Sequence, residues 1–535
     1  MNVLLVYPRF PITYWGFQYG MHLIDKRAAL PPLGLLTVAA LLPIEWDLRL
    51  VDLNVGALTD DDLRWAELVL TGGLLIQAES MQEVVARAVA CERPVAVGGP
   101  APTASPDLFA DADVVFQGEA EGRIDDVLRA LARPSEGRVV LQAPATFPDM
   151  TSAPVPRFDL LDLSKYASVS VQYSRGCPFQ CEFCDVIEIF GRKPRVKSPD
   201  QVLAELEAVY RAGYRGTLFF VDDNFIGNRA AVRRLLPIVK AWQDERARPF
   251  EFYTEASVDL ADDPKLLVDM VDAGFSSVFV GIETPSRAAL EQTNKLHNLR
   301  VDLSDGIDRI TRAGIEVMGG FIVGFDTDDE AIFAQQREFI ASQPMPLAMV
   351  GLLTALPGTA LGRRLEAEGR LRERSNGDQF SRPNFVPAMD ERTLLRGYIE
   401  LMEWLYSPKA YYRRCEAYLD RAGVLVETRS STSNEVGTLL RTIWHVGLLG
   451  PRRSHFWRLM VKAMSKGRSH LRQAVAHAVQ GEHLITYTRT HLVPRLERAL
   501  GQLQAEFELR APALLRAQQA EPASVESVAL AAEHP

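Results

Sequence analysis

Short apolar runs alternate with stretches of helical periodicity over the first part of the chain. Such runs predict strands at residues 3–7, 48–51, 68–71, 95–97 and 114–116, with helices near 32–42, 79–90 and 121–132. Buried strands that alternate with helices are typical of a parallel sheet covered by helices. The pattern therefore predicts a Rossmann-like α/β unit over residues 1–135.

A second series of alternating strands and helices follows. Its strands are expected at residues 168–173, 217–221, 250–254, 277–282, 317–323 and 348–353. Successive βα units predict a partial (β/α)6 barrel over residues 161–370, and the chemistry of such barrels lies at the carboxyl ends of the strands. Residues 136–160 contain Pro and Ser with little periodicity, so we expect a linker between the two units.

Helical periodicity dominates the rest of the chain and predicts a helical region over residues 371–517. One stretch there has an apolar stripe of Phe456, Leu459, Met460 and Met464, surrounded by Arg452, Arg453, Arg458, Lys462, Lys466, Arg468 and Arg472. A basic amphipathic helix can lie on an anionic membrane, which would give peripheral membrane contact. The alternative is an ordinary packed helix with a solvated face. Residues 518–535 are rich in Ala, Glu and Ser, and we expect them to be disordered.

Composition narrows the class of protein. A chain of 535 residues is too long for one core of ordinary size, and its net charge of −10 is spread widely, which argues against a nucleic-acid partner. No segment approaches the about 20 apolar residues that a membrane-spanning helix needs. The start, MNVLLVYPRF, is typical of a strand rather than a signal peptide. We therefore expect a cytoplasmic protein with reduced cysteines.

Three of the cysteines carry the strongest chemical signal. Cys177, Cys181 and Cys184 follow a predicted strand and are spaced so that their thiolates can converge on one cluster. A [4Fe-4S] cube normally takes four ligands, so three leave one iron free to chelate a small molecule. The alternative is a zinc site with a fourth ligand, although no His lies nearby in the sequence.

The motif Cys-x3-Cys-x2-Cys, within SRGCPFQCEFC, resembles that of the radical S-adenosylmethionine (radical SAM) superfamily. The resemblance implies that the open iron binds the amino and carboxylate groups of S-adenosylmethionine. It also implies that an electron from the cluster cleaves this molecule to a 5′-deoxyadenosyl radical. By the same resemblance, Phe183 lies against the nucleoside.

Other strand ends resemble motifs of the same superfamily. The resemblance implies that Asp222, Asp223 and Asn224 contact the methionine amino group, where Gly-Gly-Glu is commoner. Carboxylates at strand ends can accept bonds from ribose hydroxyls, and the backbone can approach adenine at glycines. The residues implied in these contacts are Glu255, Ser257, Glu283, Gly320, Ile322 and Gly324. The alternative for Asp222, Glu255 and Glu283 is a capping or salt-bridged carboxylate.

The N-terminal unit resembles the cobalamin-binding domain of cobalamin-dependent radical SAM proteins, in phrases such as PPLGLLTVAALLP, VGGP and QGEAE. Ligands of open α/β sheets bind outside the carboxyl ends of the strands. The expected contacts are Thr71, Gly72, Gly98, Gly99, Gly118 and Glu119. Tight turns are the alternative for the glycines. The Asp-x-His-x-x-Gly signature is absent, so cobalt would lack an imidazole from that motif; a domain that keeps the fold without cobalamin is the alternative.

Within this subgroup, the chain is most similar to the hopanoid C-2 methylase family, over about residues 1–370. The resemblance implies cobalamin-dependent methyl transfer to an unactivated carbon of a small-molecule or hopanoid-like lipid substrate, with flavodoxin or ferredoxin as reductant. Two alternatives are a cyclisation or rearrangement without net methylation and a non-catalytic cobalamin-binding sensor.

Overall fold

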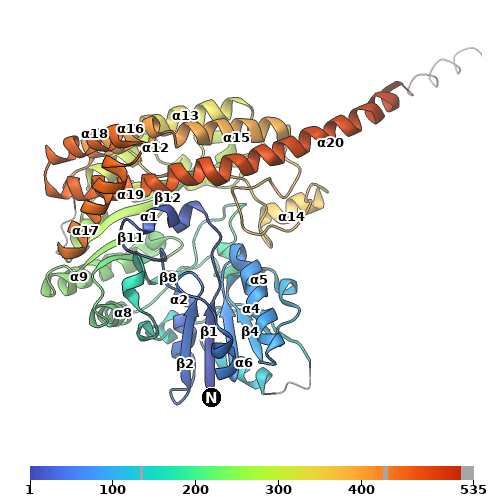
Figure 1. Ribbon diagram of the computed structural model, residues 1–535, viewed down its shortest axis with the longest axis vertical. Helices are drawn as coiled ribbons and strands as arrows, with labels where there is room; N and C mark the ends of the chain where they lie inside the picture. The colour runs from blue at the N-terminus through green and yellow to red at the C-terminus, as the bar shows by residue number, and fades with distance from the viewer. Residues whose placement is uncertain (133–136, 426–431, 520–535) are drawn as a thin grey trace, which may run out of the picture.

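The computed structural model describes residues 1–132, 137–425 and 432–519. An N-terminal α/β unit stands below a second α/β unit, and a layer of helices covers the far side of the second unit (Figure 1). The last helix, α20 (Val493–Gln519), extends away from the body of the protein. Residues 520–535, most of the tail expected to be disordered, lie outside the described residues.

The first sheet is parallel throughout, with the strand order β2-β1-β3-β4-β5-β6. Alternate residues of β1 pack on opposite faces, since Val3 and Leu5 belong to one apolar core and Leu4 and Val6 to another. Its elements are β1 (Asn2–Tyr7), α1 (Gln18–Met21), α2 (Leu33–Leu41), β2 (Asp47–Asp52), α3 (Asp60–Trp65), β3 (Leu68–Gly72), α4 (Ala78–Ala90), β4 (Val95–Gly98), α5 (Pro100–Ala104), β5 (Val114–Phe116), α6 (Ile124–Leu131) and β6 (Val139–Leu141). The expected Rossmann-like fold is therefore present.

The sixth strand corrects the linker prediction. β6 lies within the segment 136–160 and pairs in parallel with β5, with Val114 opposite Val139. Its Val-Val-Leu run is too short to show periodicity, and only the edge of β5 gives it hydrogen-bonding partners. The connection between the two units therefore begins after Leu141 rather than at residue 136.

The second sheet is also parallel, and its strands follow one another in chain order as a partial barrel. Its elements are β7 (Ser168–Val171), β10 (Gly216–Phe220), β11 (Phe250–Glu255), β12 (Phe275–Glu283), β13 (Glu316–Val323), β14 (Ala348–Leu352), α8 (Pro199–Arg211), α9 (Arg229–Glu245), α10 (Pro264–Ala273), α11 (Arg287–Gln292), α12 (Leu303–Arg312), α13 (Ala331–Ser342) and α14 (Ala360–Ala367). A short antiparallel pair, β8 (Ser174–Arg175) and β9 (Arg195–Val196), stands beside it.

The C-terminal helices share one core with the barrel instead of forming a separate domain. The hydroxyls of Tyr398 and Tyr406 donate to the β14 carbonyls of Val350 and Ala348 at 2.7 and 2.6 Å. These helices are α15 (Glu391–Leu405), α16 (Pro408–Arg421), α17 (Thr432–Thr442), α18 (Arg453–Met464), α19 (Arg468–Tyr487) and α20, and a π-helical turn (Ile443–Leu448) follows α17.

The apolar stripe of α18 packs inside the protein. Phe456, Leu459 and Met460 are buried in the shared core, whereas Met464 is exposed. Arg458 pairs with Glu416, and Lys462 pairs with Asp420, both on the neighbouring α16. The stripe is therefore that of an ordinary packed helix and gives no support for membrane contact. Among the described helices, none combines the length and the apolarity that crossing a bilayer requires.

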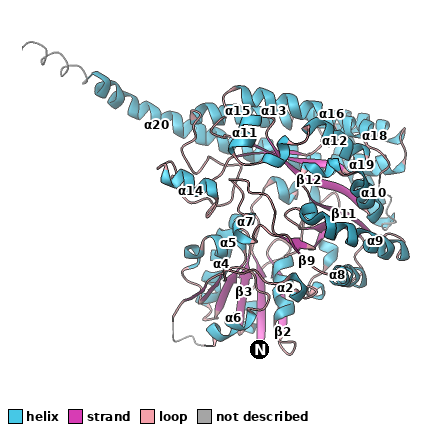
Figure 2. Ribbon diagram, turned by 180° about the vertical axis from the view of Figure 1, so that it is seen from behind, coloured by secondary structure: helices cyan, strands magenta, loops and turns pink. Residues whose placement is uncertain are grey.

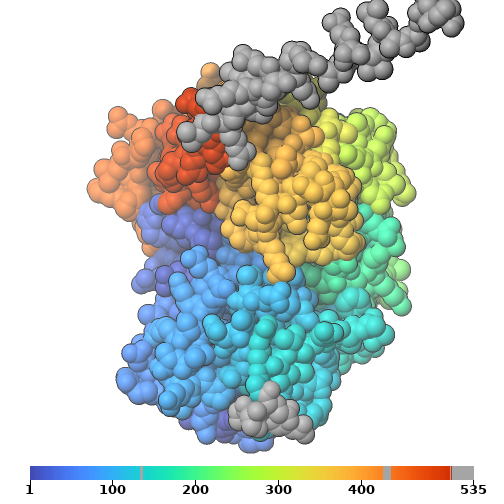
Figure 3. All heavy atoms as spheres, turned by 90° about the vertical axis from the view of Figure 1, so that its right-hand side faces the viewer, coloured from blue at the N-terminus to red at the C-terminus, as the bar shows by residue number. Residues whose placement is uncertain are grey.

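The two α/β units are joined by backbone and side-chain contacts. Residues 27–29 run beside 165–168, and the buried Tyr166 hydroxyl donates to Asp52 at the end of β2 at 2.8 Å. Seen from the side, the segment from α14 to the start of α15 lies directly above the N-terminal unit (Figure 3). Strand ends of both sheets therefore face a shared central region (Figure 2).

Candidate functional site

The three cysteines lie in one loop between β8 and α7 (Val186–Ile189), beyond the carboxyl end of β7. All three thiols are free. Gly176 precedes them with a φ of +94°, and a Cβ at this position would lie 2.8 Å from the carbonyl oxygen of Gly191. Only glycine tolerates both the conformation and this approach, so Gly176 sets the path of the loop.

Two acidic residues after β10 hold the start of the cysteine loop. Both oxygens of the buried Asp222 are occupied, because they accept bonds from the amides of Tyr173 and Ser174 at 2.8 Å and from the Ser174 hydroxyl at 2.7 Å. Asp223 accepts from the Gly176 amide at 3.0 Å. Burial raises the pKa of Asp222 to about 7 and that of Asp223 to about 6. Asp222 thus positions the loop, as in the capping alternative, and its contact with the ligand stays a prediction.

Residues 293–298 hold the other side of the loop. The Glu182 amide donates to the Thr293 carbonyl at 2.9 Å, and the Asn294 side chain donates to the Gln180 carbonyl at 3.2 Å. The rings of Phe179 and His297 stack with centroids 3.7 Å apart. The loop is therefore fixed from two sides before any ligand binds, as a preorganised site requires.

Lys295 was missed by sequence analysis, since nothing in the Thr-Asn-Lys run marks it. Its ammonium lies 2.5 Å from a carboxylate oxygen of Glu283, and both side chains are largely buried. Glu283, at the end of β12, has a φ of +64°, a strained conformation of the kind concentrated at functional sites. Its expected ribose contact is replaced in this structure by the ion pair.

Burial raises the pKa of all three cysteine thiols, and the charge of Lys295 opposes this shift. Lys295 therefore favours the thiolate forms that bind metal. No three His, Cys, Asp or Glu side chains in the described part of the chain are grouped closely enough to share one metal ion. A [4Fe-4S] cube binds each thiolate at a different iron, so it does not need the three sulfurs to meet at one point. The residues present fit this group.

Glu255 ends β11 without a cationic partner of its own. Burial raises its pKa to about 8, and the nearby carboxylates of Asp223 and Asp222 add to the shift. Among the described residues it has no hydrogen-bond partner, so its carboxylate is available to a cationic ligand.

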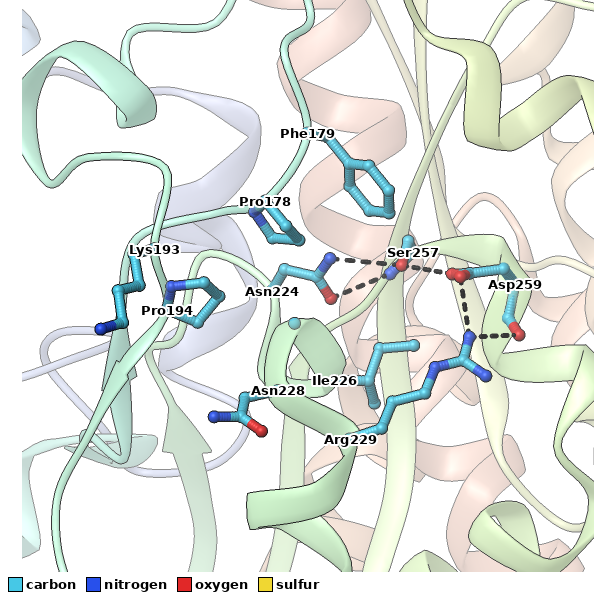
Figure 4. Close-up of a pocket in the computed structure, with 11 residues that line it drawn as sticks. Pro178, Phe179, Lys193, Pro194, Asn224, Ile226, Asn228, Arg229, Ser257 and Asp259 are labelled. Carbon is cyan, nitrogen blue, oxygen red and sulfur yellow. Dashed lines mark hydrogen bonds and ion pairs between the residues drawn. The ribbon is translucent and has the colours of Figure 1, made fainter.

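A cavity of about 470 Å³ opens beside the cysteine loop (Figure 4). The Asn224 amide donates to the Ser257 hydroxyl at 3.2 Å, and Asp259 accepts from the same hydroxyl and pairs with Arg229. The cavity is lined by Pro178, Phe179, Lys193, Pro194, Asn224, Ile226, Gly227, Asn228, Arg229, Ser257 and Asp259. Asn224 and Ser257, both predicted to bind S-adenosylmethionine, thus lie together at this cavity.

Phe183 and Ile322 contact one small apolar cluster, whose buried members include Phe325 and Leu353. The rings of Phe183 and Phe325 lie 6.1 Å apart. Gly324 has a φ of +101°, and its amide donates to Asp328 at 2.9 Å. Phe183 and Ile322, both predicted to contact the adenosyl group, therefore lie against one apolar cluster.

Gly320 serves a different purpose. A Cβ there would lie 2.7 Å from the ring of Phe279, so this glycine makes room for an aromatic side chain of β12. The adenine approach expected at Gly320 stays a prediction.

At the N-terminal sheet edge, the predicted glycines pack against one another. A Cβ on Gly72 would lie 2.8 Å from the Gly98 carbonyl oxygen, Gly99 has a φ of +96°, and the Gly118 amide donates to Thr103. The hydroxyl of Thr71 is buried and has no partner in the described structure. An unpaired buried hydroxyl at this edge fits a polar ligand such as the side chains of a corrinoid.

Glu119 is committed to ion pairs and so does not match its predicted ligand role. It pairs with Arg175 and Arg195 at 2.5 Å, while Glu121 pairs with Arg175 at 2.7 Å. All four side chains are largely buried. This network joins the N-terminal sheet edge to the strands that flank the cysteine loop.

Comparison with family models identifies two segments. Residues 171–339 match the radical SAM superfamily, and residues 359–494 match a domain of unknown function, DUF4070. The first match contains the cysteine loop and most of the barrel. The second covers α14 and the helices that share the core of the barrel.

Two curated relatives match nearly the whole chain. The uncharacterized methyltransferase sll1242 of Synechocystis sp. is 40% identical over 91% of this chain and 92% of that protein. The hopanoid C-2 methylase of Rhodopseudomonas palustris is 37% identical over 91% of this chain and 94% of that protein. The solved structure of OxsB, a cobalamin-dependent radical enzyme with aqua-cobalamin and S-adenosylmethionine bound, matches with a TM-score of 0.59. It covers 95% of this chain and 80% of that chain at 15% identity, which shows a shared fold.

Proposed function

This chain belongs to the radical SAM methyltransferase family that includes the hopanoid C-2 methylase, and we propose that it methylates an unactivated carbon of a hopanoid-like lipid. The observation that carries the proposal is the cysteine loop, which is fixed at the carboxyl ends of the barrel strands and faces the edge of the N-terminal sheet. A reaction between two cofactors needs both edges to open onto one region.

The residues divide into groups with separate tasks. Cys177, Cys181 and Cys184 would hold the [4Fe-4S] cluster, and the edge at Thr71 would hold cobalamin. When bound, the cluster supplies the electron that cleaves S-adenosylmethionine, and cobalamin supplies the methyl group. Glu255 would face the sulfonium charge, Asp223, Asn224 and Ser257 would bind the methionine portion, and Phe183 and Ile322 would pack on the adenine.

The inner face of the barrel supports an apolar substrate. Phe219 and Tyr253 stack with centroids 4.5 Å apart, and the Phe279 ring lies 5.1 Å from Trp15. Their neighbours along the strands, such as Leu218, point the other way into the core beneath the helices. Partly exposed aromatic rings on this inner face favour a bulky, apolar molecule such as a polycyclic lipid.

Anaerobic incubation with a hopanoid, S-adenosylmethionine, cobalamin and reduced flavodoxin or ferredoxin tests the proposal. We expect a product that is heavier by one methylene, together with 5′-deoxyadenosine. An isomerised product of unchanged mass would assign a rearrangement instead. A protein with neither iron nor turnover of S-adenosylmethionine would be a sensor, and either result would overturn the proposal.

The affinity for S-adenosylmethionine should depend on pH through Glu255. The folded pKa of about 8 lies above the ordinary value, so the carboxyl group is mostly neutral at pH 6.5 and ionises as the pH rises to 8.5. Only the ionised form attracts a sulfonium. The ratio of the Kd of Glu255→Gln to that of the wild type should therefore increase about tenfold between these pH values. Equilibrium dialysis of both proteins measures it, and a ratio independent of pH would exclude this role.

A further inference from the structure

A patch of exposed apolar side chains lies on α17, the π-helical turn and α18, on faces other than the buried stripe of α18. The turn and α18 are joined by a hydrogen bond from the Trp457 indole to the Gly447 carbonyl at 2.8 Å. The α17–α18 patch comprises Val436, Leu440, Trp444, Leu448, Leu449, Trp457, Val461 and Met464.

The exposure of this patch is high for side chains of this size. Leu440 is 60% exposed, Trp444 56%, Leu449 66% and Val461 61%. Residues 436, 440, 444 and 448 recur every four positions, so they follow one side of the α17 segment. Large apolar side chains exposed on successive helical turns are typical of an interaction site.

The segment that carries the patch is rich in basic residues. Residues 436–481 contain no Asp or Glu, although the chain as a whole carries a net charge of −10. The cations of this segment are Arg441, Arg452, Arg453, Arg458, Lys462, Lys466, Arg468 and Arg472. Six of them pair with carboxylates: Arg452 with Glu482, Arg458 with Glu416, Lys462 and Lys466 with Asp420, and Arg468 and Arg472 with Glu435. Arg453 is exposed and has no ion pair within the described ranges.

We propose that the α17–α18 patch docks on the surface of an anionic lipid bilayer. Trp444 and Trp457 suit the headgroup level, where an indole can bury its ring and keep its N–H hydrogen-bonded. Leu440, Leu449 and Val461 would enter the acyl boundary, and the surrounding cations would meet anionic headgroups. A second copy of this chain is disfavoured, because a symmetric contact would bring two basic segments together.

α17 and α18 both lie at one end of the helical region, and the π-helical turn connects them (Figure 1). Docking there would hold the whole protein at the membrane surface without inserting the barrel. The inference does not depend on the identity of the substrate, because it rests on the exposed residues and their charges alone.

Flotation of the full, cofactor-loaded chain with vesicles tests the proposal. Phosphatidylcholine vesicles are compared with phosphatidylcholine mixed with phosphatidylglycerol. The wild type should float with the anionic vesicles. The triple variant Leu440→Ser, Trp444→Ser and Val461→Ser should lose at least about tenfold in apparent affinity, because it removes three inserted side chains. High salt should weaken wild-type binding.

A matched control removes exposed apolar residues elsewhere. Ile44, Val268 and Val386 are 90%, 56% and 44% exposed, and their triple replacement by Ser should leave flotation unchanged. Circular dichroism confirms that both variants fold. Wild-type protein that stays soluble with both vesicle types, or equal binding by both variants, would overturn the proposal. Light scattering that shows dimers of the wild type but not of the patch variant, in the absence of flotation, would also overturn the proposal. The patch would then bind a second copy of this chain. Flotation does not require catalytic turnover, so its result tests membrane docking independently of the proposed methylation.

Discussion

Replacement of Cys177, Cys181 or Cys184 by Ala is expected to abolish both iron binding and the formation of 5′-deoxyadenosine. A [4Fe-4S] cluster with only two protein ligands is bound weakly. When the cluster is lost, the protein has no electron donor that can reduce S-adenosylmethionine. Removing groups that merely orient metal ligands costs about 10–100-fold in affinity or activity, so the loss of a ligand should exceed about a hundredfold. Iron and sulfide analysis of anaerobically reconstituted protein, with chromatography of the nucleosides, measures both effects.

The chain supplies its own controls for this experiment. Cys91 and Cys415 are free cysteines outside the loop, and Cys415 is fully buried in the shared core. Their Ala variants should retain iron content and nucleoside formation at the wild-type level. If Cys181→Ala still formed 5′-deoxyadenosine at the control rate, the cysteine loop would not be required for the reaction.

Arg175→Met should be the most damaging single change to stability at the interface between the two α/β units. Arg175 is paired with both Glu119 and Glu121, and all three side chains are largely buried. Although burial raises the pKa of Glu121, Arg175 lowers it below the ordinary value, so the charge of Glu121 depends on this cation, whereas Glu119 also pairs with Arg195. Breaking a buried pair leaves an uncompensated charge and costs about 3–5 kcal/mol. The midpoint of urea unfolding, followed by circular dichroism, should fall accordingly.

An exposed ion pair serves as a control that distinguishes the effect of burial on stability from the effect of charge. Arg64 and Asp61 form an ion pair on α3 with both side chains mostly in solvent. Arg64→Met should therefore change stability by no more than about 1 kcal/mol. Neutralising Glu121 to Gln in the Arg175→Met background should restore part of the loss, because Glu119 keeps its pair with Arg195. Equal midpoints for Arg175→Met and Arg64→Met would show that the network does not stabilise the interface.

The distribution of fixed and free groups around the cysteine loop has a functional meaning. Asp222, Glu182 and His297 are occupied by contacts that hold the loop, whereas Glu255 has no partner among the described residues. Catalytic geometry is better preserved when positioning groups are separate from ligand-binding groups. The ion pair of Glu283 and Lys295 lies beside the thiols.

The sequence by itself determined the two α/β units, the helical C-terminal region and the cysteine motif. These features depend on short-range properties: the alternation of apolar runs with helical periodicity, and the spacing of three thiols within eight residues. The family resemblance rests on the same local motifs, and the relatives at 40% and 37% identity confirm it.

Only the tertiary structure decided which of the predicted residues are free to bind a ligand. Glu119 meets Arg175, 56 residues away, and Asp222 meets Ser174, 48 residues away. The buried face of α18 was likewise fixed by α16 and the barrel, because an amphipathic pattern does not say what covers it. The role of a side chain depends on which residues, distant in the sequence, lie next to it in the folded protein. The local sequence does not encode these contacts.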